Sequence, residues 1–157
     1  SGRFELADSI FRLAVDLNDT DPWTVTSAAL GHAFGGKHKD AMELAEAALR
    51  RVVLPSPVHW TYQCQIRVIC GDYEGALTAA ERAENATPFL PGWRAAALSA
   101  LSRDQDAREA RRELIANIRQ VWFGDPNPSD FAIWHWFANC FPFRDEAQRR
   151  KLFGGLN

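Results

Sequence analysis

The stretch that most constrains the fold runs from residue 57 to residue 88, PVHWTYQCQIRVICGDYEGALTAAERAENATP. Two segments of helical periodicity flank the turn Gly71-Asp72-Tyr73, and a proline stands at each end. Glycine is common just after the C-terminus of a helix, because it adopts the left-handed conformation without strain. Pro88 closes the unit, because proline cannot continue a helix. The stretch therefore predicts two short helices joined by a tight turn.

Weaker copies of this unit occur on both sides of it. Ala41 precedes Ala76 at an offset of 35, in the same position after a glycine turn. Downstream, the counterpart of Ala76 is either Ala107, at an offset of 31, or Ala110, at an offset of 34. We favour Ala107, because Ser102 then occupies the position of the turn glycine. Self-similarity at this period indicates a helical repeat array.

The central unit resembles the tetratricopeptide repeat, whose pattern over about 34 residues is W-x2-L-G-x2-Y, then A-x3-F, then P. Trp60 and Pro88 match this pattern. Gln63-Cys64 stands at the Leu-Gly pair, Arg67 at the tyrosine and Ala80 at the phenylalanine. The resemblance implies an all-α fold, a right-handed α-solenoid of antiparallel helix pairs.

We expect one domain of about three such repeats with an aromatic cap at its C-terminal end. Ala7 precedes Ala41 at an offset of 34, so the chain begins within the second helix of a truncated repeat. Array ends normally carry a polar cap, and we therefore expect further sequence upstream of this fragment. The expected divisions are residues 1–20 (truncated repeat), 21–55 (repeat), 56–88 (repeat), 89–121 (degenerate repeat) and 122–157 (cap).

The cap is marked by eight aromatic residues within a short span. They are Trp122, Phe123, Phe131, Trp134, Trp136, Phe137, Phe141 and Phe143. Ser129-Asp130 and Asp145 are N-cap signals, which predict one helix to about Asn139 and another to about Phe153. One interpretation packs Phe131, Trp134 and Phe137 onto the third repeat, because buried aromatic rings contribute large apolar areas. The alternative is an exposed docking patch at Trp134 and Trp136.

The terminal run is similar to the closing segment of tetratricopeptide regions in bacterial class III adenylate and guanylate cyclases and in related winged-helix regulators. It comprises residues 141–147, FPFRDEA, and residues 151–156, KLFGGL. This similarity implies a bacterial signalling or transcriptional regulator whose output domain lies N-terminal to the chain.

Composition excludes several classes of protein. With 46% hydrophobic residues the chain can bury a sizeable core, and a net charge of −2 argues against binding to nucleic acid. No stretch reaches the roughly 18 apolar residues that a membrane span needs. Cys64, Cys70 and Cys140 form no CxxC pair, which favours a reduced, cytoplasmic protein.

We find no pattern that indicates catalysis, a cofactor or a metal. Residues 31–38, GHAFGGKH, come close to a phosphate-binding loop, but a helix precedes them and His38 replaces the hydroxyl residue. Histidines and cysteines lack the spacing of a zinc site. His135 between two tryptophans is a possible pH sensor, although an exposed helix position explains it as well. We therefore expect a protein without enzymatic activity.

The resemblance places a binding groove on the concave surface, along the first helix of each repeat. The expected groove residues are Trp23, Thr26, Leu30, Ala33, Phe34, Val58, Thr61, Gln65, Val68 and Ile69. They lack the Lys, Asn and Arg that hold a C-terminal carboxylate in this family, so an apolar helix or another part of the same protein is the expected ligand.

We therefore expect a protein-protein interaction module of a regulator, binding a protein or peptide partner or a second copy of itself. The alternative is a helical repeat domain that senses a small molecule and regulates an attached output domain.

Overall fold

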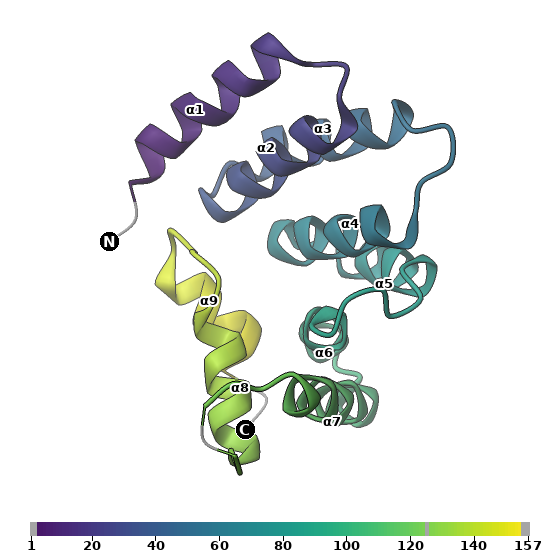
Figure 1. The fold of residues 1–157 in the computed structure, drawn as a ribbon, viewed down its shortest axis with the longest axis vertical. Coiled ribbons are helices and arrows are strands. Elements are labelled where there is room, and N and C mark those ends of the chain that lie inside the picture. Colours follow the sequence, from purple (N-terminus) through teal and green to yellow (C-terminus); the bar gives the residue numbers. More distant parts are fainter. Residues whose placement is uncertain (1–2, 125, 155–157) are drawn as a thin grey trace.

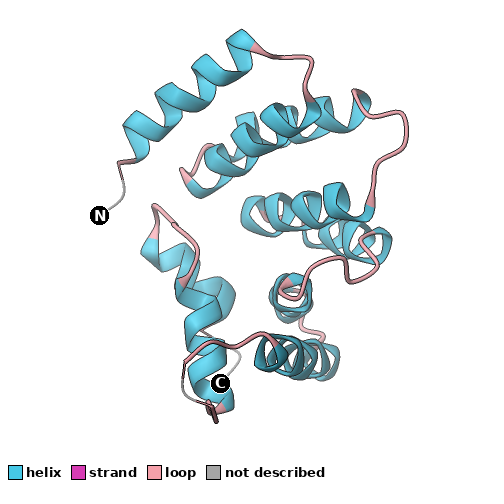
Figure 2. Cartoon of the chain, in the orientation of Figure 1, coloured by secondary structure: helices cyan, strands magenta, loops and turns pink. Residues whose placement is uncertain are grey.

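The computed structural model describes residues 3–124 and 126–154. Ser1-Gly2, Asp125 and the Gly155-Leu156 end of the terminal motif lie outside the described residues. The described chain forms helices and no strand, which confirms the all-α class (Figure 2). Its helices are α1 (Phe4–Leu17), α2 (Pro22–Phe34), α3 (His38–Arg50), α4 (Pro57–Cys70), α5 (Tyr73–Arg82), α6 (Leu90–Ala100), α7 (Asp104–Gln120), α8 (Asp130–Asn139) and α9 (Glu146–Phe153).

Helices α1 to α7 follow one another around an arc, and α8 and α9 lie on its open side (Figure 1). Within the arc, α2 packs against α3, α4 against α5, and α6 against α7. No described helix is long and apolar enough to cross a membrane.

The same turn joins the two helices of each of these pairs. Its first residue has positive φ in all three cases: 81° at Gly36, 87° at Gly71 and 59° at Ser102. The next backbone N–H then donates to a carbonyl five residues earlier, at 2.9 Å each time: Lys37 to His32, Asp72 to Arg67 and Arg103 to Leu98. This hydrogen bond is typical of a helix that ends in a left-handed residue.

The repeated turn resolves the register of the third pair. The alanine that lies five residues after each turn residue is fully buried, and these alanines are Ala41, Ala76 and Ala107. Ala107 is therefore the counterpart of Ala76, as expected. The shorter step between these two alanines leaves α6 with 11 residues, against 14 in α4.

Local capping accounts for several of the helix starts. Asp21, Ser129 and Asp145 each accept a hydrogen bond from a backbone N–H of the first turn, so all three are N-caps, as the sequence signals at Ser129 and Asp145 predict. At α4 the cap is a reciprocal pair, in which Ser56 N–H donates to Nδ1 of His59 at 3.2 Å. Histidine here takes the role that glutamate or glutamine has in most capping boxes.

Alanine dominates the contacts between the helices of the arc. Its small side chain lets helices approach closely, and larger side chains fill the remaining space between them. Trp60 is only partly buried, and the guanidinium of Arg82 lies 4.6 Å from the centre of its ring. Fully or nearly fully buried alanines are Ala28, Ala29, Ala33, Ala41, Ala45, Ala48, Ala76, Ala79, Ala83, Ala95, Ala96, Ala97, Ala107 and Ala110.

An aromatic cluster fills the inner side of the arc. Trp93 of α6 is fully buried at its centre, with ring centroids 4.7 Å from Phe141, 5.4 Å from Phe153 and 6.1 Å from Phe137. Phe34 of α2 joins it from the far end of the arc, at 6.4 Å from Trp93. The C-terminal segment (residues 126–154) therefore packs against α2 and α6 and, through Gln148, against α4, and not against the third repeat alone.

The interpretation that Phe131, Trp134 and Phe137 are buried in the cap is right for two of these three rings. Trp134 and Phe137 are buried, and the indole N–H of Trp134 donates to the carbonyl of Phe153 at 3.2 Å. Phe131 is 64% exposed, so its expected burial is wrong. The expected docking patch is wrong for Trp134, which is 3% exposed, whereas Trp136 is 44% exposed. These two tryptophans lie two residues apart on α8 and therefore point to different sides of the helix.

Candidate functional site

An apolar pocket of about 470 Å³ lies where α1, α2 and α4 meet the segment before α9. Its lining comes from parts of the chain that are far apart in sequence. The residues that shape it most are Phe4, Phe11, Leu30, Phe34, Tyr62 and Pro142. We call it the concave pocket, since Leu30 and Phe34 belong to the expected concave groove.

Helical spacing brings the lining residues to one face of each helix. On α1, Phe4 and Phe11 are seven residues apart, which is close to two helical turns. On α2, Leu30 and Phe34 are one turn apart. Between them, Gly31 lets the ring of Phe11 lie directly on the α2 backbone, because a Cβ at this position would overlap that ring. The pocket wall therefore depends on a glycine.

Asp8 holds α1 against α2 beside this pocket. One carboxylate oxygen lies 2.6 Å from Nζ of Lys37 and the other lies 3.0 Å from Nδ1 of the buried His32. The hydrogen bond from Lys37 is the main reason why the pKa of Asp8 lies below its ordinary value. Burial lowers the pKa of His32, and attraction by Asp8 only partly offsets this effect. His32 is consequently neutral at neutral pH.

A stack of rings forms the outer rim on the α4 side. The ring of Trp23 stacks on His59, with centroids 4.1 Å apart and an interplanar angle of 25°. Tyr62 meets Trp23 edge-on at 5.9 Å. Burial lowers the pKa of His59. At neutral pH this favours the uncharged ring within the stack.

Only part of the expected groove remains open to a partner. Trp23 and Val58 are exposed and Leu30 is partly buried. The other expected residues are buried, namely Thr26, Ala33, Phe34, Thr61, Gln65, Val68 and Ile69. Two contacts explain much of this burial: α2 packs on α4, and the C-terminal segment occupies the inner side of the arc.

Polar contacts fix that segment in place. The amide of Gln148 donates to the carbonyl of Ile69 at 2.6 Å, and the backbone N–H of Arg144 donates to the carbonyl of Phe34 at 2.9 Å. The C-terminal segment of the chain therefore lies against much of the expected groove.

Sequence reasoning did not assign Phe4, Phe11, Tyr62 and Pro142 to the site. Phe4 stands two helical turns before Phe11, and this spacing was a usable signal. Pro142 has no such signal, because it reaches the pocket only through the fold of the C-terminal segment.

The chemistry available to the concave pocket is the sequestration of an apolar group. Apart from the hydroxyl of Tyr62, its polar side chains are those of Arg3 and Ser27. Among the described residues, no three His, Cys, Asp or Glu side chains lie close enough together to hold a metal ion. Burial raises the pKa of Cys64 and Cys70 to about 12, so both thiols are protonated at neutral pH. Residues 31–38, the near match to a phosphate loop, form the end of α2, the turn at Gly36 and the start of α3.

The chain was compared with protein-family models, with curated proteins and with solved structures, and none of the three comparisons finds a match.

Proposed function

We propose that the chain is a protein-protein interaction module that binds an apolar segment of a partner protein in the concave pocket. Phe4, Phe11, Leu30 and Tyr62 form walls suited to one or two large aliphatic or aromatic side chains. Such anchors contribute most of the affinity in many interfaces. Arg3 and Ser27 at the edge supply polar groups that can orient the segment.

The observation that carries this proposal is a partly filled concave surface with an apolar pocket left at its end. The exposed Trp23 and Val58 lie beyond the Tyr62 side and extend the apolar surface. The aromatic cluster holds α2 and the C-terminal segment, and Asp8 holds α1 against α2, so the pocket is preformed. A preformed site lowers the ordering cost of binding.

Within this proposal the helix pairs form a right-handed solenoid of antiparallel pairs, like that of tetratricopeptide repeats. The three equivalent turns support this arrangement. We further propose that the module belongs to a bacterial regulator and acts in the cytoplasm, which rests on the resemblance of its terminal motif.

A selection from phage-displayed random peptides tests the proposal with a defined reagent. We expect enrichment of peptides that carry adjacent aromatic or aliphatic residues. A synthetic copy of an enriched peptide should bind Leu30→Glu at least about tenfold more weakly, because a charge would be buried in the contact. The matched control is Leu54→Glu, at a position that is 86% exposed in the loop before α4. Equal affinity for both variants would contradict the proposal.

The volume of the concave pocket supports a second candidate, a domain that senses a small molecule. At about 470 Å³ it falls within the roughly 300–1,000 Å³ of small-molecule sites. A panel of apolar metabolites, screened by thermal shift, separates the two functions. Saturable stabilisation that Leu30→Glu abolishes, with no peptide enriched, would favour the sensor over the interaction module.

A further inference from the structure

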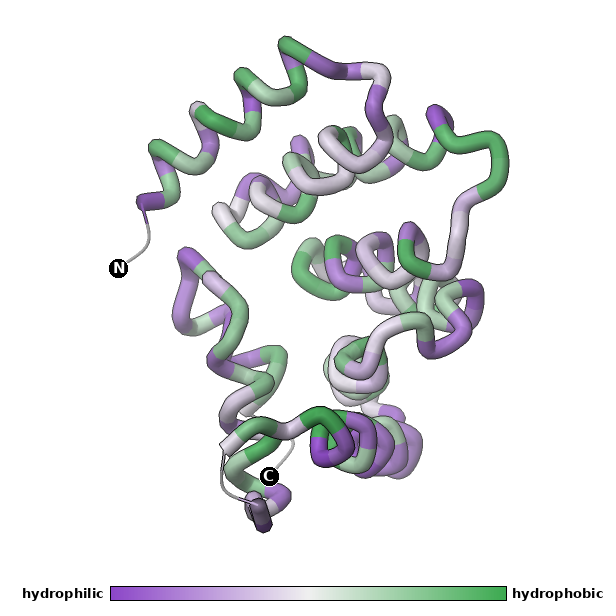
Figure 3. The backbone as a smooth tube through the Cα atoms, in the orientation of Figure 1, coloured by the Kyte–Doolittle hydropathy of each residue, from purple (hydrophilic) through white to green (hydrophobic). Residues whose placement is uncertain are grey.

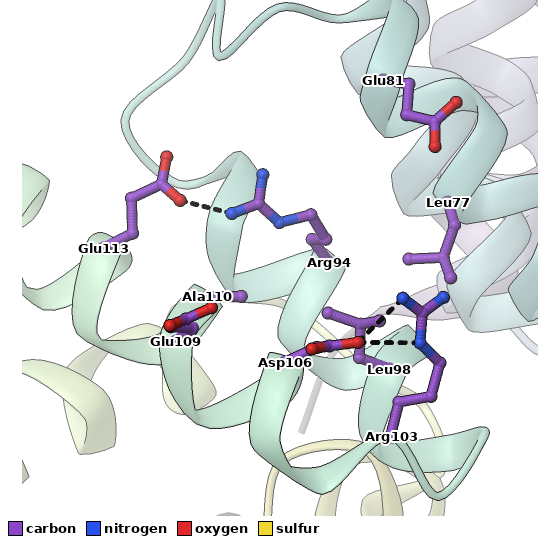
Figure 4. Close-up of a pocket in the computed structure, with 9 residues that line it drawn as sticks. All are labelled: Leu77, Glu81, Arg94, Leu98, Arg103, Asp106, Glu109, Ala110 and Glu113. Atoms are coloured by element: carbon purple, nitrogen blue, oxygen red, sulfur yellow. Dashed lines mark hydrogen bonds and ion pairs between the residues drawn. The ribbon is translucent and has the colours of Figure 1, made fainter.

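A second groove, of about 540 Å³, lies where α5, α6 and α7 meet, and it shares no residue with the concave pocket (Figure 4). Its apolar lining consists of Leu77 from α5, Leu98 from α6 and Ala110 from α7. Charged side chains surround this apolar strip. We call it the outer groove.

The charges of the outer groove are unbalanced. Its lining carries two arginines and four carboxylates, namely Arg94, Arg103, Glu81, Asp106, Glu109 and Glu113. Both arginines are already paired in Figure 4. Arg103 binds Asp106 through two hydrogen bonds, at 2.8 and 3.0 Å, and Arg94 binds Glu113.

Two carboxylates are left over, on opposite walls. Glu81 on α5 and Glu109 on α7 are exposed, and their side chains make no hydrogen bond or ion pair with any described residue. The groove therefore presents an apolar strip between two uncompensated negative charges. Figure 3 shows how hydrophilic α7 is along most of its length.

The preceding helix pair shows that the fold does not require these acids. Counting from the shared turn residues, 71 and 102, the positions of Asp106, Glu109 and Glu113 correspond to Gly75, Thr78 and Arg82. The same architecture is thus built there with one positive side chain in place of three negative ones.

In the α4/α5 pair, other side chains occupy the space that corresponds to the outer groove. Arg82 lies over the ring of Trp60, and Gln63 donates to the carbonyl of Ala45 at 2.8 Å. The offset that relates the two turns places Pro91 at the position of Trp60. Proline supplies no aromatic ring for an arginine to cover, and Glu113 stands at the position of Arg82.

We propose that the outer groove binds a basic segment of a partner protein, one that carries at least two arginine or lysine side chains. The aliphatic stems of such side chains cover Leu77 and Leu98, and their charged ends meet Glu81 and Glu109. The net charge of −2 on the lining attracts such a segment and repels the phosphates of nucleic acid. The partner is thus complementary to the groove in charge and in apolar surface.

The test measures binding of a fluorescein-labelled, alanine-based peptide with arginines on one helical face, by fluorescence polarisation at low salt. The same peptide with glutamine in place of arginine is the probe control. We expect the double variant Glu81→Gln/Glu109→Gln to lose about tenfold in affinity, since two opposite charges are removed from the contact.

The matched control variant is Asp16→Asn/Glu74→Gln, which changes the net charge by the same amount at two exposed acids outside the groove. It should lose less than about twofold. Equal losses in the two variants, or no binding of the arginine peptide to the wild-type protein, would overturn the proposal. So would groove-dependent binding of spermine without binding of the peptide, because the site would then be one for small polyamines.

Leu30→Glu separates this proposal from the proposed function. It alters the concave pocket and should leave the affinity of the arginine peptide unchanged. Circular dichroism of all variants checks that the helices are intact.

Discussion

The backbone N–H of Arg144 donates a hydrogen bond to the carbonyl oxygen of Phe34, 2.9 Å away, and thereby joins the last turn of α2 to the segment before α9. The rings of Phe34 and Phe143 meet edge-on beside it, with centroids 5.1 Å apart. A carbonyl at the C-terminus of a helix has no partner within that helix, so this bond satisfies it. The contact connects the start of the arc to the C-terminal segment across most of the chain and defines one edge of the concave pocket.

Gly92→Ala should destabilise the protein by about 1–3 kcal/mol, because a Cβ at this position would overlap the ring of Phe137. The higher helix propensity of alanine would offset at most about 1 kcal/mol of that loss. Urea denaturation measures the change, with Ser99→Ala on the same helix as control. A Gly92→Ala protein as stable as the wild type would show that Phe137 can move aside.

Trp134→Ala and Trp136→Ala should differ sharply in their effect on stability. Trp134 is buried among Phe137 and Phe153, and its loss should cost about 3–5 kcal/mol. Trp136 is 44% exposed, so its loss should cost much less, about 1 kcal/mol. The midpoints of urea unfolding report both values. Similar midpoints for the two variants would mean that α8 is rotated from the orientation that buries Trp134 and exposes Trp136.

Stability should fall as the pH is lowered from about 7.5 to about 5.5. Burial depresses the pKa of His32 and of His59 below the ordinary value near 6.5. As the pH falls through 6.5, the unfolded chain therefore binds protons that the folded chain excludes, and the free energy of unfolding decreases. Asp8, whose pKa is also lowered, loses its contribution only when the pH falls below its ordinary value of about 3.8.

The double variant His32→Gln/His59→Gln isolates this effect. The difference between its melting temperatures at the two pH values should be smaller than in the wild type. An unchanged difference would assign the pH dependence to other groups.

Asp8→Asn should loosen α1 selectively. The carboxylate links α1 to Lys37 and His32, and α1 has α2 as its main helical neighbour. We expect faster amide hydrogen exchange in residues 4–17, with little change in α4 to α7. Asp16→Asn, on the exposed side of the same helix, is the control. Uniform acceleration in all helices would show that α1 unfolds only together with the rest of the chain.

Much of the local structure was predictable from the sequence, because its causes lie within a few residues. The turns at Gly36, Gly71 and Ser102 and the N-caps at Asp21, Ser129 and Asp145 depend on neighbouring groups alone. Even the shorter offset between the second and third pairs could be predicted from the positions of Ser102 and Ala107.

The accessible surface was less predictable. The repeat pattern indicates which face of α2 and α4 turns inward, but it does not show what fills the inner side. Thr61 and Val68 were expected to face a partner, yet both are fully buried. Trp134 and Trp136 carry the same type of side chain in the same helix, and only the packing of α8 separates the buried ring from the exposed one.

The sequence by itself determined the helices, their turns and their repeated order, because hydrogen bonds and backbone preferences over a few residues control them. The tertiary structure alone decided which apolar surface stays open. Phe34, Trp93 and Phe153 come together from distant parts of the chain, and their mutual burial fills the inner side of the arc. The concave pocket at Leu30 and the outer groove at Glu81 and Glu109 both remain accessible, and packing between helices created both.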